Sequence, residues 1–167
     1  MKPLSECPLY AFLDTDYLKR RAAEDVAKQL CHGGADLFPL RAKKSSVSEI
    51  LRLAELIMPI TQQASVGLVI NDHSSVAQAV GADLCHLGQE DFFDAGYKTV
   101  AELKGDNSKL KVGLSTHAPE QAERSVAAGA DYIAIGPVYA TATKPDAKPV
   151  GLDSVRWAAQ NVSIPWF

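Results

Sequence analysis

The chain has 167 residues, 47% of them hydrophobic and 22% charged, with a net charge of −3 at pH 7. Such a chain can fold as one globular domain without disulfides or a structural metal. Its slight acidity excludes a general attraction to nucleic acid or anionic membranes, and no segment approaches the roughly 20 apolar residues of a membrane span. Its three cysteines form no zinc-binding pattern or CxxC pair, so we expect a reducing, cytoplasmic location.

Strand-like and helix-like segments alternate along the whole chain. We expect strands at 9–14, 36–42, 66–71, 83–87, 110–116 and 131–136. Helices are expected between and after them, at roughly 16–32, 46–63, 74–80, 99–104, 119–128 and 151–160. The strands are apolar almost throughout, which is typical of a parallel sheet covered by helices.

A Gly-Ala-Asp triplet occurs three times, at 34–36, 81–83 and 129–131, with spacings of 47 and 48 residues. Each triplet follows a helix-like segment and precedes a strand-like one. Glycine fits the position just after a helix, where a left-handed backbone conformation is favourable. The spacing therefore indicates two βα units per repeat, or about 24 residues per unit.

This pattern leaves two architectures open, a doubly wound open sheet and a closed barrel. No GxGxxG motif follows the first strand, and the short, even period favours a (β/α)8 TIM barrel in a single domain at 1–167. Eight units need about 190 residues. We therefore expect a C-terminally incomplete barrel that lacks its last one to two βα units, with 164–167 resembling the start of a seventh strand.

Polar residues gather where five consecutive strands end, which is where βα barrels place their chemistry. Asp72 and Asp91 have the carboxylates to hold Mg²⁺, which uses one or two carboxylates and completes its shell with water and phosphate. Arg41, Lys43 and Lys144 provide cationic groups that can bind phosphates. Neutral hydrogen bonds are expected from Asn71, Ser115, Thr141 and Thr143. The set predicts a magnesium-dependent site for a diphosphate.

Several of these residues have a second interpretation. Asp72 can equally cap the following helix. His86, inside a strand, is either a buried core histidine or a substrate contact. His73 and His117 are expected to be loop or capping residues, and Lys44 a solvated charge. No Cys-His or Ser-His-Asp arrangement favours a covalent mechanism.

At these residues the sequence resembles the thiamine phosphate synthase family. The resemblance runs from Leu9 to Ala159 and is most specific in GLVINDHSSVAQAVGADLCHLGQEDF (67–92), VGLSTH (112–117) and GADYIAIGPVYATATK (129–144). It implies a (β/α)8 enzyme that condenses hydroxymethylpyrimidine diphosphate with thiazole phosphate, giving thiamine phosphate and diphosphate by a dissociative, Mg²⁺-dependent mechanism.

The resemblance also implies a role for each matching residue. Arg41 and Lys43 would contact the pyrimidine diphosphate beside Asn71, and Asp72 and Asp91 would bind the metal. Ser115 and Lys144 would hold the diphosphate, and Thr141 and Thr143 the thiazole phosphate. The catalytic set is then Arg41, Lys43, Ser115 and Lys144, while His86 is counted among the substrate-binding residues.

Two departures from the family pattern leave other functions open. Pro39 stands where the family usually has a glutamine that contacts the pyrimidine substrate, and the glycine-bearing loops that hold the thiazole phosphate would lie beyond Phe167. A thiazole tautomerase-like enzyme and a non-catalytic relative that binds a thiamine precursor are the alternatives. The expected partners are small phosphorylated molecules, with no nucleic acid or membrane, and a homo-oligomer is possible because an incomplete barrel has an open edge.

Overall fold

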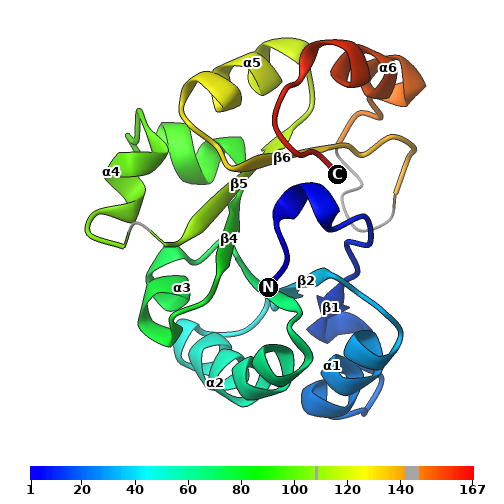
Figure 1. Cartoon of the computed structure of the whole chain (residues 1–167), viewed down its shortest axis with the longest axis vertical. Helices are drawn as coiled ribbons and strands as arrows, with labels where there is room; N and C mark the ends of the chain where they lie inside the picture. The colour runs from blue at the N-terminus through cyan, green and yellow to red at the C-terminus, as the bar shows by residue number, and fades with distance from the viewer. Residues whose placement is uncertain (108, 142–146) are drawn as a thin grey trace. The chain divides into compact units, whose positions relative to one another are not determined.

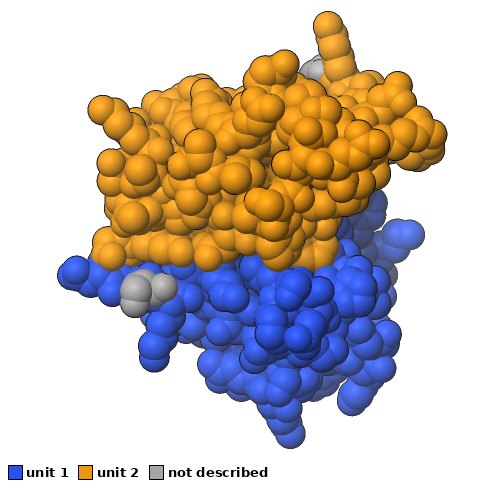
Figure 2. Space-filling view, turned by 45° about the horizontal axis from the view of Figure 1, so that its top comes forward, with its two compact units in different colours: residues 1–86, 106–111 blue, residues 87–105, 112–167 orange. Residues whose placement is uncertain are grey.

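The computed structural model describes residues 1–107, 109–141 and 147–167. Six parallel strands form one sheet in the order of the sequence, from β1 to β6, with helices between them (Figure 1). The predicted α/β class and parallel sheet are confirmed, whereas closure into a barrel stays a prediction. The chain divides into two compact units, residues 1–86 with 106–111 and residues 87–105 with 112–167 (Figure 2).

In its described residues, the first unit contains four parallel strands and three α-helices. They are β1 (Leu13–Asp14), α1 (Ala23–His32), β2 (Leu37–Arg41), α2 (Val47–Ala64), β3 (Gly67–Asn71), α3 (Ser74–Val80) and β4 (Leu84–Leu87), whose last residue belongs to the second unit. Short 3-10 helices cover Leu4–Glu6 and Thr15–Tyr17. A capping box of Ser46 and Glu49 begins α2, so its start is encoded locally.

Strand β1 is shorter than the expected 9–14, and Pro39 supplies the reason. The amide and carbonyl of Leu37 bond toward the first strand, to Leu9 and Ala11. Because these groups alternate in direction along a strand, the nitrogen of Pro39 also faces β1, and proline has no hydrogen to donate there. Pairing is consequently limited to a bridge at Tyr10 and to Leu13–Asp14.

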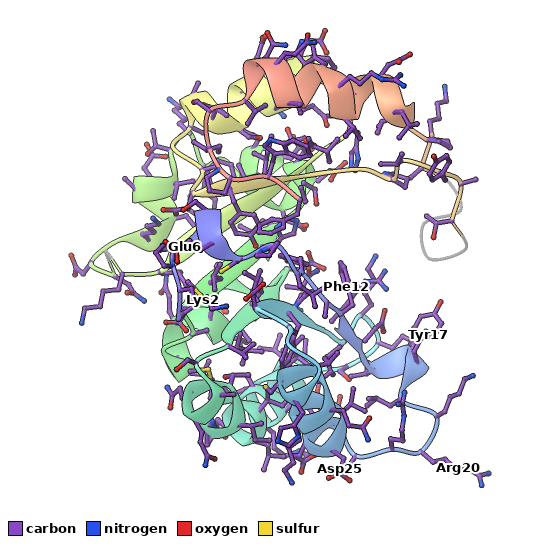
Figure 3. All side chains as sticks on the ribbon, turned by 45° about the vertical axis from the view of Figure 1, so that its right-hand side comes forward. Lys2, Glu6, Phe12, Tyr17, Arg20 and Asp25 are labelled. Atoms are coloured by element: carbon purple, nitrogen blue, oxygen red, sulfur yellow. The ribbon has the colours of Figure 1, made fainter. Side chains whose placement is uncertain are left out.

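Helix α1 begins seven residues later than the expected start at 16. Lys19 and Arg20 have φ angles of 48° and 72°, which a right-handed helix cannot contain. The segment before them forms a separate 3-10 turn, in which the Asp14 carboxylate accepts a hydrogen bond from the amide of Asp16. Phe12 and Tyr17, labelled in Figure 3, are 62% and 53% exposed.

The second unit contains two parallel strands and three α-helices in its described residues. They are α4 (Val100–Lys104), β5 (Lys111–Thr116), whose first residue belongs to the first unit, α5 (Pro119–Ala127), β6 (Tyr132–Ile135) and α6 (Gly151–Asn161). A π-helical turn at Glu90–Asp94 precedes α4. Pro119 occupies the first turn of α5, where its missing amide hydrogen costs no helix bond, and Ala118 is the N-cap. The core of this unit includes the fully buried ring of Tyr132.

Gly113 makes room for that ring. The two residues are directly paired between β5 and β6. A Cβ atom on Gly113 would lie 2.0 Å from the nearest atom of the Tyr132 ring, which no real side chain tolerates. Glycine is therefore required at this position of β5 for close packing.

The Gly-Ala-Asp repeats have matching structures in the two units. The φ angles at Gly34, Gly81 and Gly129 are 86°, 65° and 85°, which confirms the predicted left-handed helix ends. The Asp36 carboxylate accepts the amide of Leu9 at 3.0 Å and the ammonium of Lys2 (Figure 3) at 2.8 Å.

Asp131 makes the equivalent pair of bonds in the second unit. Its carboxylate accepts the amide of Val112 and the ammonium of Lys104, both at 2.8 Å. Asp131 thus ties the start of β6 to the start of β5, and Asp36 ties the start of β2 to the segment before β1. In the described part of the chain, no helix is both long and apolar enough to cross a membrane.

Candidate active site

The end of β2 carries the first two predicted site residues. The guanidinium of Arg41 pairs with the carboxylate of Asp14, and their side chains are only 15% and 11% exposed. Lys43 is exposed beyond the strand end. Lys44 pairs instead with Asp16 at 2.9 Å, and this hydrogen bond raises the pKa of Lys44 above its usual value of 10.5. Arg41 is thus half-buried at this strand end, whereas Lys43 and Lys44 are exposed.

Strands β3 and β4 place Asn71, Asp72 and His86 together. Asn71 is paired with His86 across the two strands, and the amide of Asp72 donates to the carbonyl oxygen of His86 at 2.8 Å. His86 is 7% exposed. The N-cap residue of α3 is His73, so Asp72 does not take that position. Its φ of 63° is the left-handed conformation that aspartate tolerates better than most residues.

Pro39 is buried within β2, two residues before Arg41. Residues two apart on a strand point to the same side, so Pro39 lies on the face that carries Arg41. Its ring offers no hydrogen bond to a ligand on that face. The predicted loss of a polar contact at this position stays a prediction.

Asp91 is exposed in the π-helical turn that follows β4. Its Oδ2 atom accepts a hydrogen bond from the amide of Gly88 at 3.2 Å. A Cβ atom on Gly88 would lie 2.8 Å from the same oxygen. Glycine at 88 therefore allows the carboxylate to fold back over the loop.

Ser115 is half-buried near the end of β5. Its carbonyl oxygen accepts a hydrogen bond from Nε2 of Gln89 at 2.7 Å. Gln89 is 5% exposed, and the same Nε2 donates to Oγ of Ser125 at 3.1 Å. The loop after β4 is thereby joined to the end of β5 within one unit.

The segment after β6 carries Thr141, which is half-buried. Thr143 and Lys144 lie outside the described residues. The ring Nδ1 of His117 contacts the carbonyl oxygen of Gly136, and the amide of His117 donates to Gln121 at 2.7 Å. His117 is thus a loop residue that connects the ends of β5 and β6, as the sequence favours.

The donor chemistry of Asp72 and Asp91 fits Mg²⁺, a hard cation that prefers carboxylate oxygens. The two aspartates belong to different compact units. In the part of the chain that the structure describes, no cluster of three or more His, Cys, Asp or Glu side chains can hold a metal ion. The magnesium site therefore stays a prediction.

The sequence assigned Asp14 only to the end of the first strand and gave Gln89 no site role. Asp14 contacts a residue 27 positions away, and Gln89 contacts residues 26 and 36 positions away. Only the βα repeat contained a relevant signal, because it makes the end of one strand a neighbour of the end of the next.

Comparisons with known proteins identify the family of the chain. The family model described as thiamine monophosphate synthase matches residues 9–167. A thiamine-phosphate synthase of Lawsonia intracellularis is 36% identical over 162 residues, covering 96% of this chain and 72% of that protein. One from Alkaliphilus oremlandii is 38% identical over 157 residues, covering 94% of this chain and 73% of that protein.

A solved structure gives the same result. The thiamine phosphate pyrophosphorylase from Pyrococcus furiosus has a TM-score of 0.83 and 27% identity, covering 99% of this chain and 75% of that chain. The fold and strand-end residues define a parallel α/β enzyme with groups suited to phosphorylated ligands. The chain belongs to the thiamine monophosphate synthase family.

Proposed function

We propose that the chain condenses hydroxymethylpyrimidine diphosphate with thiazole phosphate, yielding thiamine phosphate and diphosphate. The observation that carries this proposal is the family match through residues 9–167, supported by curated thiamine-phosphate synthases of 36% and 38% identity. The proposal includes a (β/α)8 barrel, a cytoplasmic location and a requirement for Mg²⁺. Asp72 and Asp91 would hold the ion.

The proposed mechanism places positive charge on the leaving diphosphate. Arg41 is oriented by Asp14 and presents a fork of donors suited to phosphate oxygens. Magnesium, when bound, supplies further positive charge to those oxygens. Lys43 and Lys144 complete the cationic set, with Lys144 assigned from its place in the TATK segment alone.

The remaining groups orient the two substrates. Ser115 would hold the diphosphate, while Thr141 and Thr143 would hold the thiazole phosphate. Departure of diphosphate leaves a pyrimidine methyl cation, which the thiazole nitrogen captures. This sequence of steps depends on alignment and charge neutralisation and needs no strong protein base.

An assay with both substrates and Mg²⁺, following thiamine phosphate and diphosphate, tests the proposal. Equal amounts of the two products, lost on adding EDTA, are expected. Tight Mg²⁺-dependent binding of the pyrimidine diphosphate without turnover would instead support a non-catalytic binding protein. Isomerisation of the thiazole phosphate without any metal requirement would support a tautomerase.

A further inference from the structure

Gln89 forms three hydrogen bonds from a nearly buried position in the second unit. Its Nε2 atom donates to the Ser115 carbonyl at 2.7 Å and to Ser125 Oγ at 3.1 Å. Its Oε1 atom accepts from Nη2 of Arg124 at 2.6 Å. Both amide hydrogens and the amide oxygen therefore have partners within the protein.

Arg124 determines which way the amide faces. A guanidinium group can only donate, so the oxygen of Gln89 must face Arg124 and its nitrogen must face Ser115. The guanidinium itself lies over the ring of Phe93, with 3.7 Å from Cζ to the ring centroid. This cation–π contact limits how Arg124 can reorient. Each amide hydrogen thus has one assigned acceptor.

The main chain of Gln89 adjoins the residue expected to bind the metal. Asp91 lies two positions later, and its carboxylate bonds back to the amide of Gly88, directly before Gln89. A shift of Gln89 would therefore move both ends of the bond that orients Asp91. The other end of the Gln89 side chain is fixed to the main chain of Ser115, the residue expected to contact the diphosphate.

We infer that Gln89 is a positioning residue. It holds the main chain next to Asp91 in a fixed position relative to the main chain of Ser115. This inference rests on the proposed function, because it assigns the metal and the diphosphate to these two loops. Groups that hold ligand-bearing loops affect binding steeply, since removing such a support typically weakens metal affinity about 10- to 100-fold. Gln89 itself need not touch substrate.

The decisive variant is Gln89→Glu, which keeps the side-chain shape and an oxygen for Arg124 but removes both donors to Ser115 and Ser125. Gln89→Met keeps similar bulk and removes all three bonds. Ser125→Ala is the matched control, because it removes one bond of the same amide and leaves the bond to Ser115. Melting curves establish that each variant is folded.

Binding of inorganic diphosphate in the presence of Mg²⁺, measured by titration calorimetry, is the readout. We expect Gln89→Glu and Gln89→Met to bind at least about 10-fold more weakly than the wild type, and Ser125→Ala within about twofold. Equal weakening in Ser125→Ala, or unchanged binding in a folded Gln89 variant, would overturn the inference. Failure of both Gln89 variants to fold would also overturn it by assigning the amide a structural role.

The same samples separate this inference from the proposed function. Wild-type turnover supports the synthase whatever the Gln89 variants do. A wild type that binds Mg²⁺ and diphosphate without turnover removes the synthase function, and the comparison of variants still decides the role of Gln89. If the wild type binds no diphosphate, the positioning role of Gln89 is excluded.

Discussion

Arg41 at the end of β2 is paired with Asp14 at the end of β1, and both side chains are largely buried. Asp14 also accepts the amide of Asp16 at 3.0 Å, which fixes the carboxylate from its own side. The guanidinium is thus held from the neighbouring strand. In the proposed synthase, an Arg41 oriented in this way would bind a phosphate group without a large loss of side-chain entropy.

Asp14→Asn tests this relationship. The change leaves a buried guanidinium without its charge partner, so the free energy of unfolding should fall by about 1–3 kcal/mol. The KM for the pyrimidine diphosphate should rise because Arg41 is no longer oriented. Urea denaturation and steady-state kinetics measure the two effects. Asp16→Asn removes only the exposed pair with Lys44 and should change neither quantity measurably.

Pro39→Gln should strengthen binding of the pyrimidine diphosphate. Glutamine restores a main-chain donor toward β1 and places an amide on the face of Arg41. One added neutral hydrogen bond is worth about 0.5–1.5 kcal/mol, or about 2- to 12-fold in KM. Pro39→Leu, which restores the main-chain donor without a polar side chain, is the control. Equal KM values for the two variants would show that the side-chain amide makes no contact.

Asp72→Asn and Asp72→Ala separate the charge of Asp72 from its backbone conformation. Asparagine tolerates the φ of 63°, so that variant should keep its stability but need at least about 10-fold more Mg²⁺ for half-maximal activity. The alanine variant should need a similarly raised Mg²⁺ concentration. It should also lose about 1–2 kcal/mol of stability, because alanine disfavours the left-handed conformation. A wild-type magnesium response in a stable Asp72→Asn protein would remove Asp72 from the metal site.

Gly113→Ala should destabilise the second unit strongly. The added methyl group would overlap the Tyr132 ring, and overpacking of a core costs about 1–3 kcal/mol or more. Tyr132→Leu creates space at the same point. Combining the two changes should cost less than the sum of their separate effects, and chemical denaturation of all four proteins measures the coupling. Strict additivity would show that the contact does not limit packing.

The Lys2–Asp36 pair predicts a pH-dependent contribution to stability. The hydrogen bond from Lys2, followed by the one from the Leu9 amide, lowers the pKa of Asp36 below its usual 3.8. A lowered carboxylate pKa stabilises the fold above the unfolded value, and the stabilisation is lost as pH falls through the folded value.

Lys2→Met should therefore be less stable than the wild type above about pH 5. The difference should shrink toward zero as the pH falls through the folded pKa of Asp36. Thermal melts from acid to neutral pH measure it. Lys28→Met, which loses an exposed 3.7 Å pair with Asp25, should differ less from the wild type. A constant difference for Lys2→Met at all pH values would contradict the linkage.

Much of the fold could be predicted because its signals are local. The apolar run at 66–71 and the capping box at Ser46 depend on neighbouring residues, and β3 and α2 form within one residue of their expected bounds. The two expected bounds that were wrong have causes outside the periodic pattern. Pro39 shortens β1 from across the sheet, and the left-handed Lys19 and Arg20 delay α1.

For the candidate site, too, local features were predictable and long-range contacts were not. The repeat indicates that the polar residues at 71–72 and 115 lie at the ends of strands, so their general place was predictable. The hydrogen-bond partners of the site residues were not predictable. Arg41 and Asp14 are 27 residues apart in the sequence, and Gln89 and Ser115 are 26 apart. Such contacts depend on strand register, which a short segment does not encode.

The sequence by itself determined the alternation of strands and helices, the strand ends that carry polar groups and the family resemblance. These follow from periodicity and from motifs that keep their order along the chain. Only the tertiary structure decided that Asp14 orients Arg41 and that Gln89 faces Ser115 rather than solvent. The physical reason is that a hydrogen bond needs its two groups within about 3 Å, and for residues more than 25 positions apart only the packed fold sets that distance.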